Sequence, residues 1–352
     1  MKTPWGSRSR ANVAFAPPLL VVVAVIALAL GACGGASTMA STSPSAMTSP
    51  SAEPSPSATP PPTPTVAGTI AFTGVVEAVI SGNGDIYVVK TDGTGLERLT
   101  DDPGFEERPA WSPDGRRIVY GGYPRGYTGP EDASVWIMNA DGSEKAQLTK
   151  GAMRGIYPSW SPDGKQIAFV NPLSNGYRIF VMNADGSGLG RVTRPPAGGT
   201  PGVAVNDLFP TWAPNGKILF LRQGQVFAVN PDGSGLVQLT KGENIICFAL
   251  SPDGKRIAVH YNNSDRVAVI SGHGGGSPVT LLEPVSDFIP DAANAAPAWT
   301  PDGQALALAT SDWTDEGEDV GGSRLYIVNA DGTGLSAVPG INNAMDPAWR
   351  PR

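Results

Sequence analysis

A five-residue motif that recurs along the chain constrains the fold more than any other feature of the sequence. Its clearest copy spans Trp160-Ser161-Pro162-Asp163-Gly164, and related copies start at Trp111, Trp212, Leu250, Trp299 and, in truncated form, Trp349. Successive copies start 38 to 52 residues apart. This period is typical of propeller blades rather than of helical solenoids.

The chemistry of the motif predicts a tight reversal of the chain. Proline pre-sets φ for the second position of a turn, aspartate bonds its own backbone, and glycine takes the left-handed conformation. Short apolar segments flank the motif, so it reads as a β-hairpin. A second turn, such as Asp185-Gly186-Ser187-Gly188, recurs in step with the first. Each repeat therefore predicts four antiparallel strands, which form one propeller blade.

The order of the pieces predicts how the fold closes. Strands expected at 69–75, 85–90 and 97–100 resemble the last three strands of a blade that lacks its first. The missing first strand is expected at 346–349, at the other end of the chain. We therefore predict an all-β, six-bladed propeller over residues 68–352, closed by strands from both termini, an arrangement that removes a free sheet edge.

The first 32 residues have the pattern of a secretory signal peptide. Three basic residues precede an apolar run at 19–32, which is shorter than the ~20 residues that span a membrane. Leu30-Gly31-Ala32-Cys33 resembles a bacterial lipobox, so we predict a lipoprotein signal peptide at 1–32 and lipidation of Cys33. The alternative is a chance cysteine behind an ordinary cleavage site.

Residues 33–67 are almost entirely Ser, Thr, Pro, Ala and Gly, with Glu53 the only charged residue. Such a segment buries too little apolar surface to offset its ordering entropy, so we predict a disordered, proline-stiffened tether. Glycosylation of its hydroxyl groups stays open, although a bare spacer is the simpler expectation.

The charge and cysteine content restrict the partners. Removal of the signal peptide takes three basic residues and no acidic one, which changes the formal net charge from −7 to −10. An acidic surface argues against nucleic acid as a partner. After lipidation of Cys33 only Cys247 remains, so we expect a buried, inert thiol and no intramolecular disulfide.

The repeated tryptophans and aspartates are predicted to be structural. Because they keep one place in every repeat, the tryptophans are expected to pack between blades and the aspartates to cap turns. These residues are Trp111, Trp160, Trp212, Trp299 and Trp349, with Asp114, Asp163, Asp253 and Asp302.

The fullest repeat reads Pro-x-Trp-Ser-Pro-Asp-Gly-Lys-x-Ile-Ala-Phe over 158–169, followed by Ile-Phe-Val-Met-Asn-Ala-Asp-Gly-Ser-Gly over 179–188. It resembles the WD40-like repeat of TolB-like six-bladed propellers, and the likeness extends over 68–352. The resemblance implies the fold but no particular ligand. Peptidases with this repeat carry an added hydrolase domain, and a pectin-fragment lyase with it uses metal-binding histidines.

No nucleophile elbow, zinc-protease motif, Cys-x-x-Cys pair or phosphate loop occurs in the sequence. Its two histidines, His260 and His273, have no partner at ligand spacing. We therefore expect a protein that is not an enzyme and has no cofactor. Calcium is the open alternative, although each Asp-Gly turn supplies one carboxylate where calcium loops need several.

Long connections are expected on the face opposite the two short turns, at 121–133, 194–206, 283–296 and 311–322. Binding residues often lie on such loops. Two groups are candidates, each with an ordinary solvated loop as its alternative: the acidic, aromatic group Asp312, Trp313, Asp315 and Glu316, and the group Tyr123, Arg125 and Tyr127. Further residues expected near the channel mouth are Glu106, Glu107, Arg108, Arg154, Tyr157 and Asp207.

Together these features predict an extracytoplasmic lipoprotein held to the membrane through Cys33. Its propeller is expected to present the long-loop face to a protein, peptide or glycan, as a binding or scaffold module. The alternative is a propeller hydrolase or lyase acting on envelope sugars or peptides, with its site assembled from separate blades.

Overall fold

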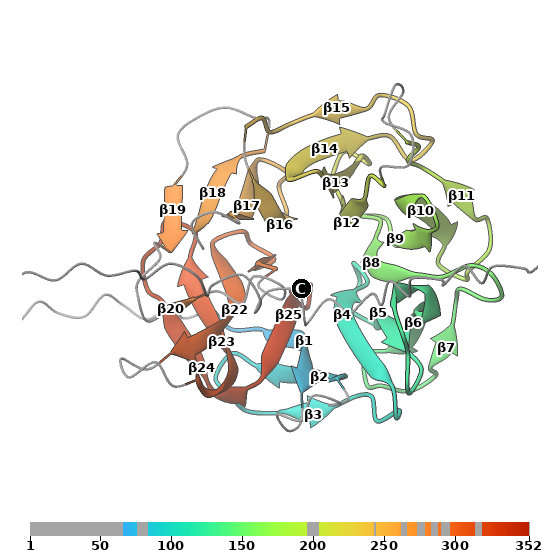
Figure 1. Ribbon diagram of the computed structural model, residues 1–352. Coiled ribbons are helices and arrows are strands. Elements are labelled where there is room, and N and C mark those ends of the chain that lie inside the picture. Colours follow the sequence, from blue (N-terminus) through green and yellow to red (C-terminus); the bar gives the residue numbers. More distant parts are fainter. Residues whose placement is uncertain are drawn as a thin grey trace, which may run out of the picture.

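Six antiparallel sheets surround a central axis in a computed structural model of the chain (Figure 1). The structure describes residues 66–75, 84–195, 204–242, 244–261, 266–272, 279–282, 288–289, 296–313 and 319–351. Apart from one short 3-10 helix, η2 (Pro130–Asp132), the regular elements in these ranges are strands. The predicted all-β, six-bladed propeller is confirmed, and no helix in these ranges is long and apolar enough to span a membrane.

Each blade is numbered here from its place in the chain. Blade 1 contains β25 (Ala344–Trp349), β1 (Thr69–Val75), β2 (Gly84–Lys90) and β3 (Glu97–Arg98). Blade 2 contains β4 (Phe105–Trp111), β5 (Arg117–Tyr123), β6 (Ser134–Asn139) and β7 (Ala146–Gln147). Blade 3 contains β8 (Ile156–Trp160), β9 (Gln166–Leu173), β10 (Gly176–Asn183) and β11 (Gly190–Arg191).

The second half of the ring follows the same order. Blade 4 contains β12 (Asp207–Trp212), β13 (Ile218–Arg222), β14 (Gln225–Val229) and β15 (Val237–Gln238). Blade 5 contains β16 (Ile245–Leu250), β17 (Arg256–Tyr261), β18 (Val267–Ser271) and β19 (Val279–Leu282). Blade 6 contains β20 (Phe288–Ile289) and β21 (Ala298–Trp299), which both pair with β22 (Ala305–Trp313), then β23 (Asp319–Asn329) and β24 (Ser336–Asn342).

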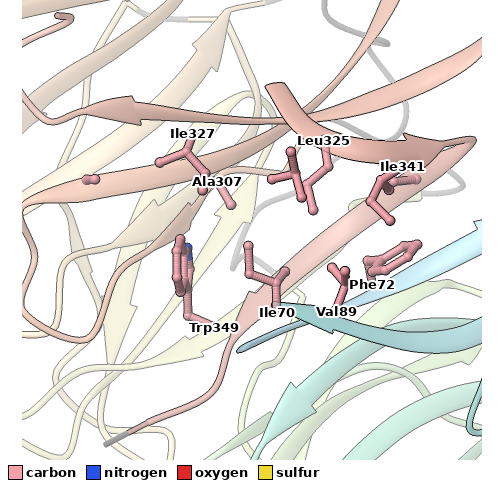
Figure 2. Packing of buried hydrophobic residues seen from close by; sticks show 11 residues of the cluster. Ile70, Phe72, Val89, Ala307, Leu325, Ile327, Ile341 and Trp349 are labelled. Carbon is pink, nitrogen blue, oxygen red and sulfur yellow. The ribbon is translucent and has the colours of Figure 1, made fainter. Parts of the chain in front are cut away.

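The ring closes in blade 1, where the last strand of the chain pairs with the first. The register places Ile70 opposite Trp349 and Gly74 opposite Ala344. Ile70, Phe72 and Trp349 then pack against Leu325 and other apolar side chains of blade 6 (Figure 2). Because β25 fills the innermost position, β1 has no unpaired inner edge, as the sequence predicted.

Both recurrent turns are held by hydrogen bonds that the side chains of their aspartates accept. In the proline turn, Asp163 Oδ1 accepts from the Ser161 hydroxyl at 2.7 Å and from the Lys165 amide at 3.1 Å. In the second turn, Asp185 Oδ1 accepts from both the Ser187 amide and the Ser187 hydroxyl. These bonds hold both reversals of blade 3.

The repeated tryptophans join neighbouring blades. The indole Nε1 of Trp160 donates to the Ala110 carbonyl of blade 2 at 3.2 Å, and Trp111 and Trp299 make the equivalent bond to Ala348 and Ala249. An arginine guanidinium stacks over each of these three indoles, as Arg117 does over Trp160 at 4.9 Å. Four of the five indoles are about 6 to 7% exposed, and Trp212 is half-buried.

Two hairpins extend further than the sequence predicted, so two loops are shorter than expected. The connection expected at 121–133 starts later, because Gly121 and Gly122 pair with Val135 and Ser134 and continue β5. The acidic loop expected at 311–322 is also shorter, because β22 continues to Trp313 and β23 begins at Asp319. In both hairpins the strands stay hydrogen-bonded through residues whose composition is typical of a loop.

Candidate functional site

The two faces of the propeller differ in what connects the strands. Both recurrent turns lie on one face, because in blades 2, 3 and 4 they join the first strand to the second and the third to the fourth. The remaining connections lie on the opposite face, which we call the loop face. In blade 2 these are residues 99–104, which enter β4, and residues 124–133, which join β5 to β6.

A pocket of about 420 Å³ opens on the loop face above blade 2. We call it the blade-2 pocket. Its buried floor comes from β4, β5 and β6, and its rim comes from the two connections and the next one along the chain. The floor residues are Glu106, Tyr120, Tyr123 and Ser134, and the charged rim residues are Asp102, Arg125, Asp132 and Arg154. The volume lies within the range of small-ligand sites.

Glu106 is the most unusual side chain in the blade-2 pocket. It is 4% exposed, and its Oε2 atom has no hydrogen-bond partner among the residues that the structure describes. Burial raises the pKa of the carboxyl group to about 8, with a smaller contribution from the charge of Asp85. A hydrogen bond with Thr100 opposes this shift. Glu106 is therefore mostly a neutral acid at pH 7, with one oxygen left for a ligand.

Aromatic side chains form much of the pocket wall. Tyr120 on β5 lies opposite Trp136 on β6, and both line the pocket. A Cβ atom at Gly122 would lie 2.8 Å from Cδ1 of Trp136, so glycine at this position leaves room for the indole. The pocket thus combines apolar walls with a few charged groups, which is typical of ligand sites.

The structure brings two of the predicted binding residues, Tyr123 and Arg125, to the blade-2 pocket. Tyr123 is the last residue of β5 and is buried, whereas Arg125 is exposed and makes no ion pair or hydrogen bond with the residues that the structure describes. Tyr127 packs its ring against Tyr123, with 4.9 Å between the ring centroids. Tyr127 therefore contacts a residue of the pocket without lining the pocket itself.

The acidic candidate group falls largely outside the described residues. Asp315 and Glu316 lie in the undescribed stretch 314–318. Asp312 and Trp313 belong to β22 by their backbone, where Asp312 pairs with Phe288 of β20 and Trp313 with Asp319 of β23. The backbone of Asp312 and Trp313 therefore belongs to blade 6.

A second cavity, of about 210 Å³, lies in the central channel. Four residues at the same place in the innermost strands have left-handed backbone conformations with φ between 49° and 55°: Arg108, Tyr157, Phe209 and Asp346. Each precedes a proline and lies at a shift of register between the first two strands of its blade. Such bulges redirect side chains, and here all four line the channel cavity.

Arg108 is the centre of the channel group. Its Nη1 atom lies 3.1 Å from Oδ1 of Asp346. Its guanidinium carbon lies 4.6 Å from the ring centroid of Tyr157 and 4.7 Å from that of Phe209. An ion pair and two cation–π contacts thus join blades 1, 2, 3 and 4 across the channel.

The other residues expected at the channel mouth have different environments. Glu106 and Arg154 line the blade-2 pocket instead of the channel. Glu107 accepts a hydrogen bond from the Tyr123 hydroxyl at 2.9 Å. Asp207 forms a buried, bidentate pair with Arg222, at 2.6 and 2.9 Å. Neighbouring residues of a strand point to opposite sides of the sheet, so Glu106 and Glu107 have surroundings different from those of Arg108.

One residue of the pocket, Trp136, had a signal in the sequence that we did not use. Trp136 and Trp313 are the tryptophans of the 68–352 region that fall outside the repeated position. Trp136 in fact lines the blade-2 pocket. Tyr120 gave no comparable signal, since an aromatic residue on a central strand is ordinary core.

The remaining titratable groups show no metal-binding arrangement within the described residues. Cys247 is buried, and burial raises the pKa of its thiol to about 12. His260 is fully buried, and burial lowers its pKa to about 4. His273 lies outside the described residues.

Comparison with known proteins agrees with this architecture. The family described as TolB beta propeller domain (PD40) matches residues 73–226. No curated protein is significantly similar in sequence to the chain.

Solved structures with a similar fold belong to proteins with different names and low sequence identity to this chain. TolB from Acinetobacter baumannii has a TM-score of 0.64 and 20% identity, over 81% of this chain and 67% of TolB. A chain of a nidogen/laminin complex has a TM-score of 0.59 and 11% identity, over 80% of this chain and 98% of its own. Hydrazine synthase from Kuenenia stuttgartiensis has a TM-score of 0.60 and 13% identity, over 81% of this chain and 47% of its own.

These identities establish the fold and carry no activity with them. The chain is a six-bladed β-propeller with the fold of the TolB propeller, and its residues 73–226 match the TolB propeller family.

Proposed function

We propose that this protein is an extracytoplasmic lipoprotein that works as a binding module, with the blade-2 pocket as its ligand site. The observation that carries the proposal is the buried Glu106 oxygen without a partner on the floor of a 420 Å³ pocket. A buried polar atom without a partner costs folding free energy, and a ligand that pairs with it recovers that cost. A protein, a peptide or a glycan can supply such a group.

The anchoring part of the proposal rests on the sequence of the first 67 residues. The lipobox-like Leu30-Gly31-Ala32-Cys33 supplies an acylation site, and the Ser/Pro/Thr-rich stretch after it supplies a spacer. A propeller tethered in this way samples partners near the membrane while the lipid retains it there. The acidic composition disfavours nucleic acid as the partner.

The anchor is tested by expressing the full chain and its Cys33→Ser variant with an alkyne-tagged fatty acid. We expect the natural chain to carry the fatty-acid label and to be recovered in the membrane fraction. The variant is expected to be unlabelled and absent from that fraction. A variant that is equally labelled and equally membrane-bound would refute lipidation at Cys33.

The ligand site is tested by thermal stabilisation of the purified full chain with calcium, oligosaccharide and peptide panels. We expect at least one oligosaccharide or peptide to raise the melting temperature, and Arg125→Ala to reduce that shift. Lys217→Ala, which removes a cation of blade 4 outside the pocket, is the matched control and is expected to leave the shift unchanged. A shift equally reduced by both variants would place the ligand elsewhere.

The second candidate function is a hydrolase or lyase that acts on envelope sugars or peptides. It is favoured by the pKa of Glu106, about 8, because an acid near neutrality can donate or accept a proton at a reacting bond. Product formation from a panel member that the chain binds, lost in Glu106→Gln, would establish this function. Binding without turnover would favour the binding module.

A further inference from the structure

The blade-2 pocket also indicates which chemical class its ligand belongs to, and this inference rests on the proposed function. Two groups in the pocket lack partners among the described residues and have opposite properties. On the floor is the buried Oε2 atom of Glu106, and on the rim is the exposed guanidinium of Arg125. A ligand that satisfies both carries a hydrogen-bond donor at one end and an anionic group at the other.

The charges around Glu106 favour a cationic donor. Asp85 of β2 and Asp102 of the β3–β4 connection both raise the pKa of Glu106, so each contributes negative potential at its carboxyl group. Lys145 of the β6–β7 turn acts in the opposite sense and is the weakest of these influences. Arg98 is occupied by Asp85, with an Nη2–Oδ2 distance of 2.9 Å. Tyr120 of β5 is neutral, because burial raises its pKa.

The walls suit an ammonium group for a second reason. Tyr120, Tyr123 and Trp136 line the pocket beside Glu106. Aromatic faces attract a cation electrostatically, and the attraction is stronger where water is excluded. A sugar hydroxyl also bonds a carboxyl group, but it gains nothing from the negative potential around Glu106.

The rim supplies the complementary charge. Arg125 is exposed and free to form a bidentate pair with a carboxylate. Arg154 lines the same rim, where its Nη1 atom donates to the Gly151 carbonyl at 2.8 Å and its charge lowers the pKa of Asp132. Arg154 is therefore already engaged, and Arg125 is the group available to a ligand.

We propose that the blade-2 pocket binds an amino acid or short peptide, whose ammonium group pairs with ionised Glu106 and whose carboxylate pairs with Arg125. Binding then converts the neutral acid to its carboxylate, and the proton goes to solvent. The ligand stays protonated at its nitrogen, so one proton is released for each ligand bound when the pH is well below 8. Affinity is expected to rise about tenfold per pH unit between pH 5 and pH 7 and to level off near pH 8, where Glu106 and the α-amino group of the ligand both titrate.

The test uses the purified full chain and three tripeptide pools, one with free termini, one acetylated at the amino end and one amidated at the carboxyl end. Binding is measured by calorimetry in two buffers of different ionisation enthalpy, which counts released protons. We expect the free pool to bind with proton release. Acetylation is expected to weaken binding at least tenfold, and amidation to weaken it by a smaller factor.

Three variants separate the two ends of the ligand. Glu106→Gln is expected to abolish proton release and the pH dependence of affinity. Arg125→Ala is expected to bind the free and amidated pools equally, since the carboxylate then has no partner. Glu97→Gln makes the same carboxylate-to-amide change on β3, outside the pocket, and is expected to behave as the natural chain. Melting temperatures of all three variants verify that they fold.

The outcomes distinguish this inference from the broader proposal. Equal affinity for the acetylated and free pools, or binding without proton release, would overturn the inference. Neutral oligosaccharides that bind in an Arg125-dependent manner would also overturn it while leaving the binding module intact. If neither peptides nor oligosaccharides bind in a way that pocket variants alter, both proposals fall.

Discussion

At the scale of single residues, Glu106 and His260 make the stability of this protein depend on pH in opposite directions. Both side chains are buried, at 4% and 0% exposure. Burial favours the neutral form of each group, which raises the pKa of the acid and lowers that of the base. Each group therefore changes the stability of the protein over its own range of pH, and a single substitution removes that contribution.

Glu106→Gln is expected to flatten the pH dependence on the alkaline side. The pKa of Glu106 is about 8 in the folded chain and 4.5 as an ordinary glutamate, so the folded state holds the proton more tightly. The stabilisation is complete below pH 4.5 and is lost as the pH rises to 8, by a few kcal/mol. Urea unfolding of the natural chain and variant at pH 5 and 8.5 measures the difference. Parallel loss of stability in both proteins would contradict the raised pKa.

His260→Leu is expected to weaken the pH dependence of the free energy of unfolding on the acid side. The pKa of His260 is about 4 in the folded chain and 6.5 when unfolded, so the unfolded state binds the proton first. This contribution to stability is fully present above pH 6.5 and is lost as the pH falls through 4, by about 3 kcal/mol. Both ring nitrogens lack partners among the described residues, so the substitution removes no hydrogen bond there. An unchanged acid transition in the variant would show that other groups cause it.

At the scale of elements, the left-handed residues of the innermost strands convert a repeated motif into a cross-channel contact. The residue before proline is restricted sterically, and non-glycine residues pay for a positive φ. Blades 1 to 4 accept this cost at Arg108, Tyr157, Phe209 and Asp346, where the bulge turns the side chain into the channel. The ion pair and aromatic contacts among them compensate.

Arg108→Met is expected to lower the free energy of unfolding by about 3–5 kcal/mol. The substitution leaves the Asp346 carboxylate buried without the cation that lies 3.1 Å from it, and removes both cation–π contacts. The double variant Arg108→Met with Asp346→Asn is expected to recover part of this loss, because neither charge of the pair remains. Chemical unfolding of the three proteins gives the coupling energy. A double variant whose loss equals the sum of the single losses would show that the pair does not interact.

At the scale of the whole molecule, closure by β25 makes the two ends of the propeller interdependent. β25 completes blade 1, and Trp111 of blade 2 bonds to its Ala348 carbonyl. Trp349 also packs between blades 1 and 6 (Figure 2). The last nine residues therefore touch three blades although they make up a small part of the chain.

Deletion of residues 344–352 is expected to lower the melting temperature by more than about 10 °C and to promote self-association through the exposed edge of β1. Deletion of residues 34–65 is the control, since the sequence predicts a tether that adds nothing to the core. Calorimetry and size-exclusion chromatography compare the two. A propeller that melts alike after either deletion would show that closure by β25 is not stabilising.

The sequence by itself determined the fold, because each blade is specified by short-range chemistry. Proline, aspartate and glycine at fixed spacing define two turns, and the period between tryptophans defines the number of blades. The closure of blade 1 also followed, since a first strand at 346–349 and three strands from residue 69 onward complete one unit. Tyr123 and Arg125 were predicted as binding residues because they lie between regular repeats, and both line the blade-2 pocket.

Only the tertiary structure decided where the site lies and what surrounds it. Glu106, Glu107 and Arg108 are consecutive in the sequence, yet they meet the blade-2 pocket, Tyr123 and the channel respectively. The alternation of side chains along β4 and the bulge before Pro109 separate these three residues. The sequence around Glu106 specifies neither its burial nor its distance from Asp85. Burial depends on how blades 1 and 2 pack against each other, and it is burial that sets the charge state of Glu106 and hence its chemistry.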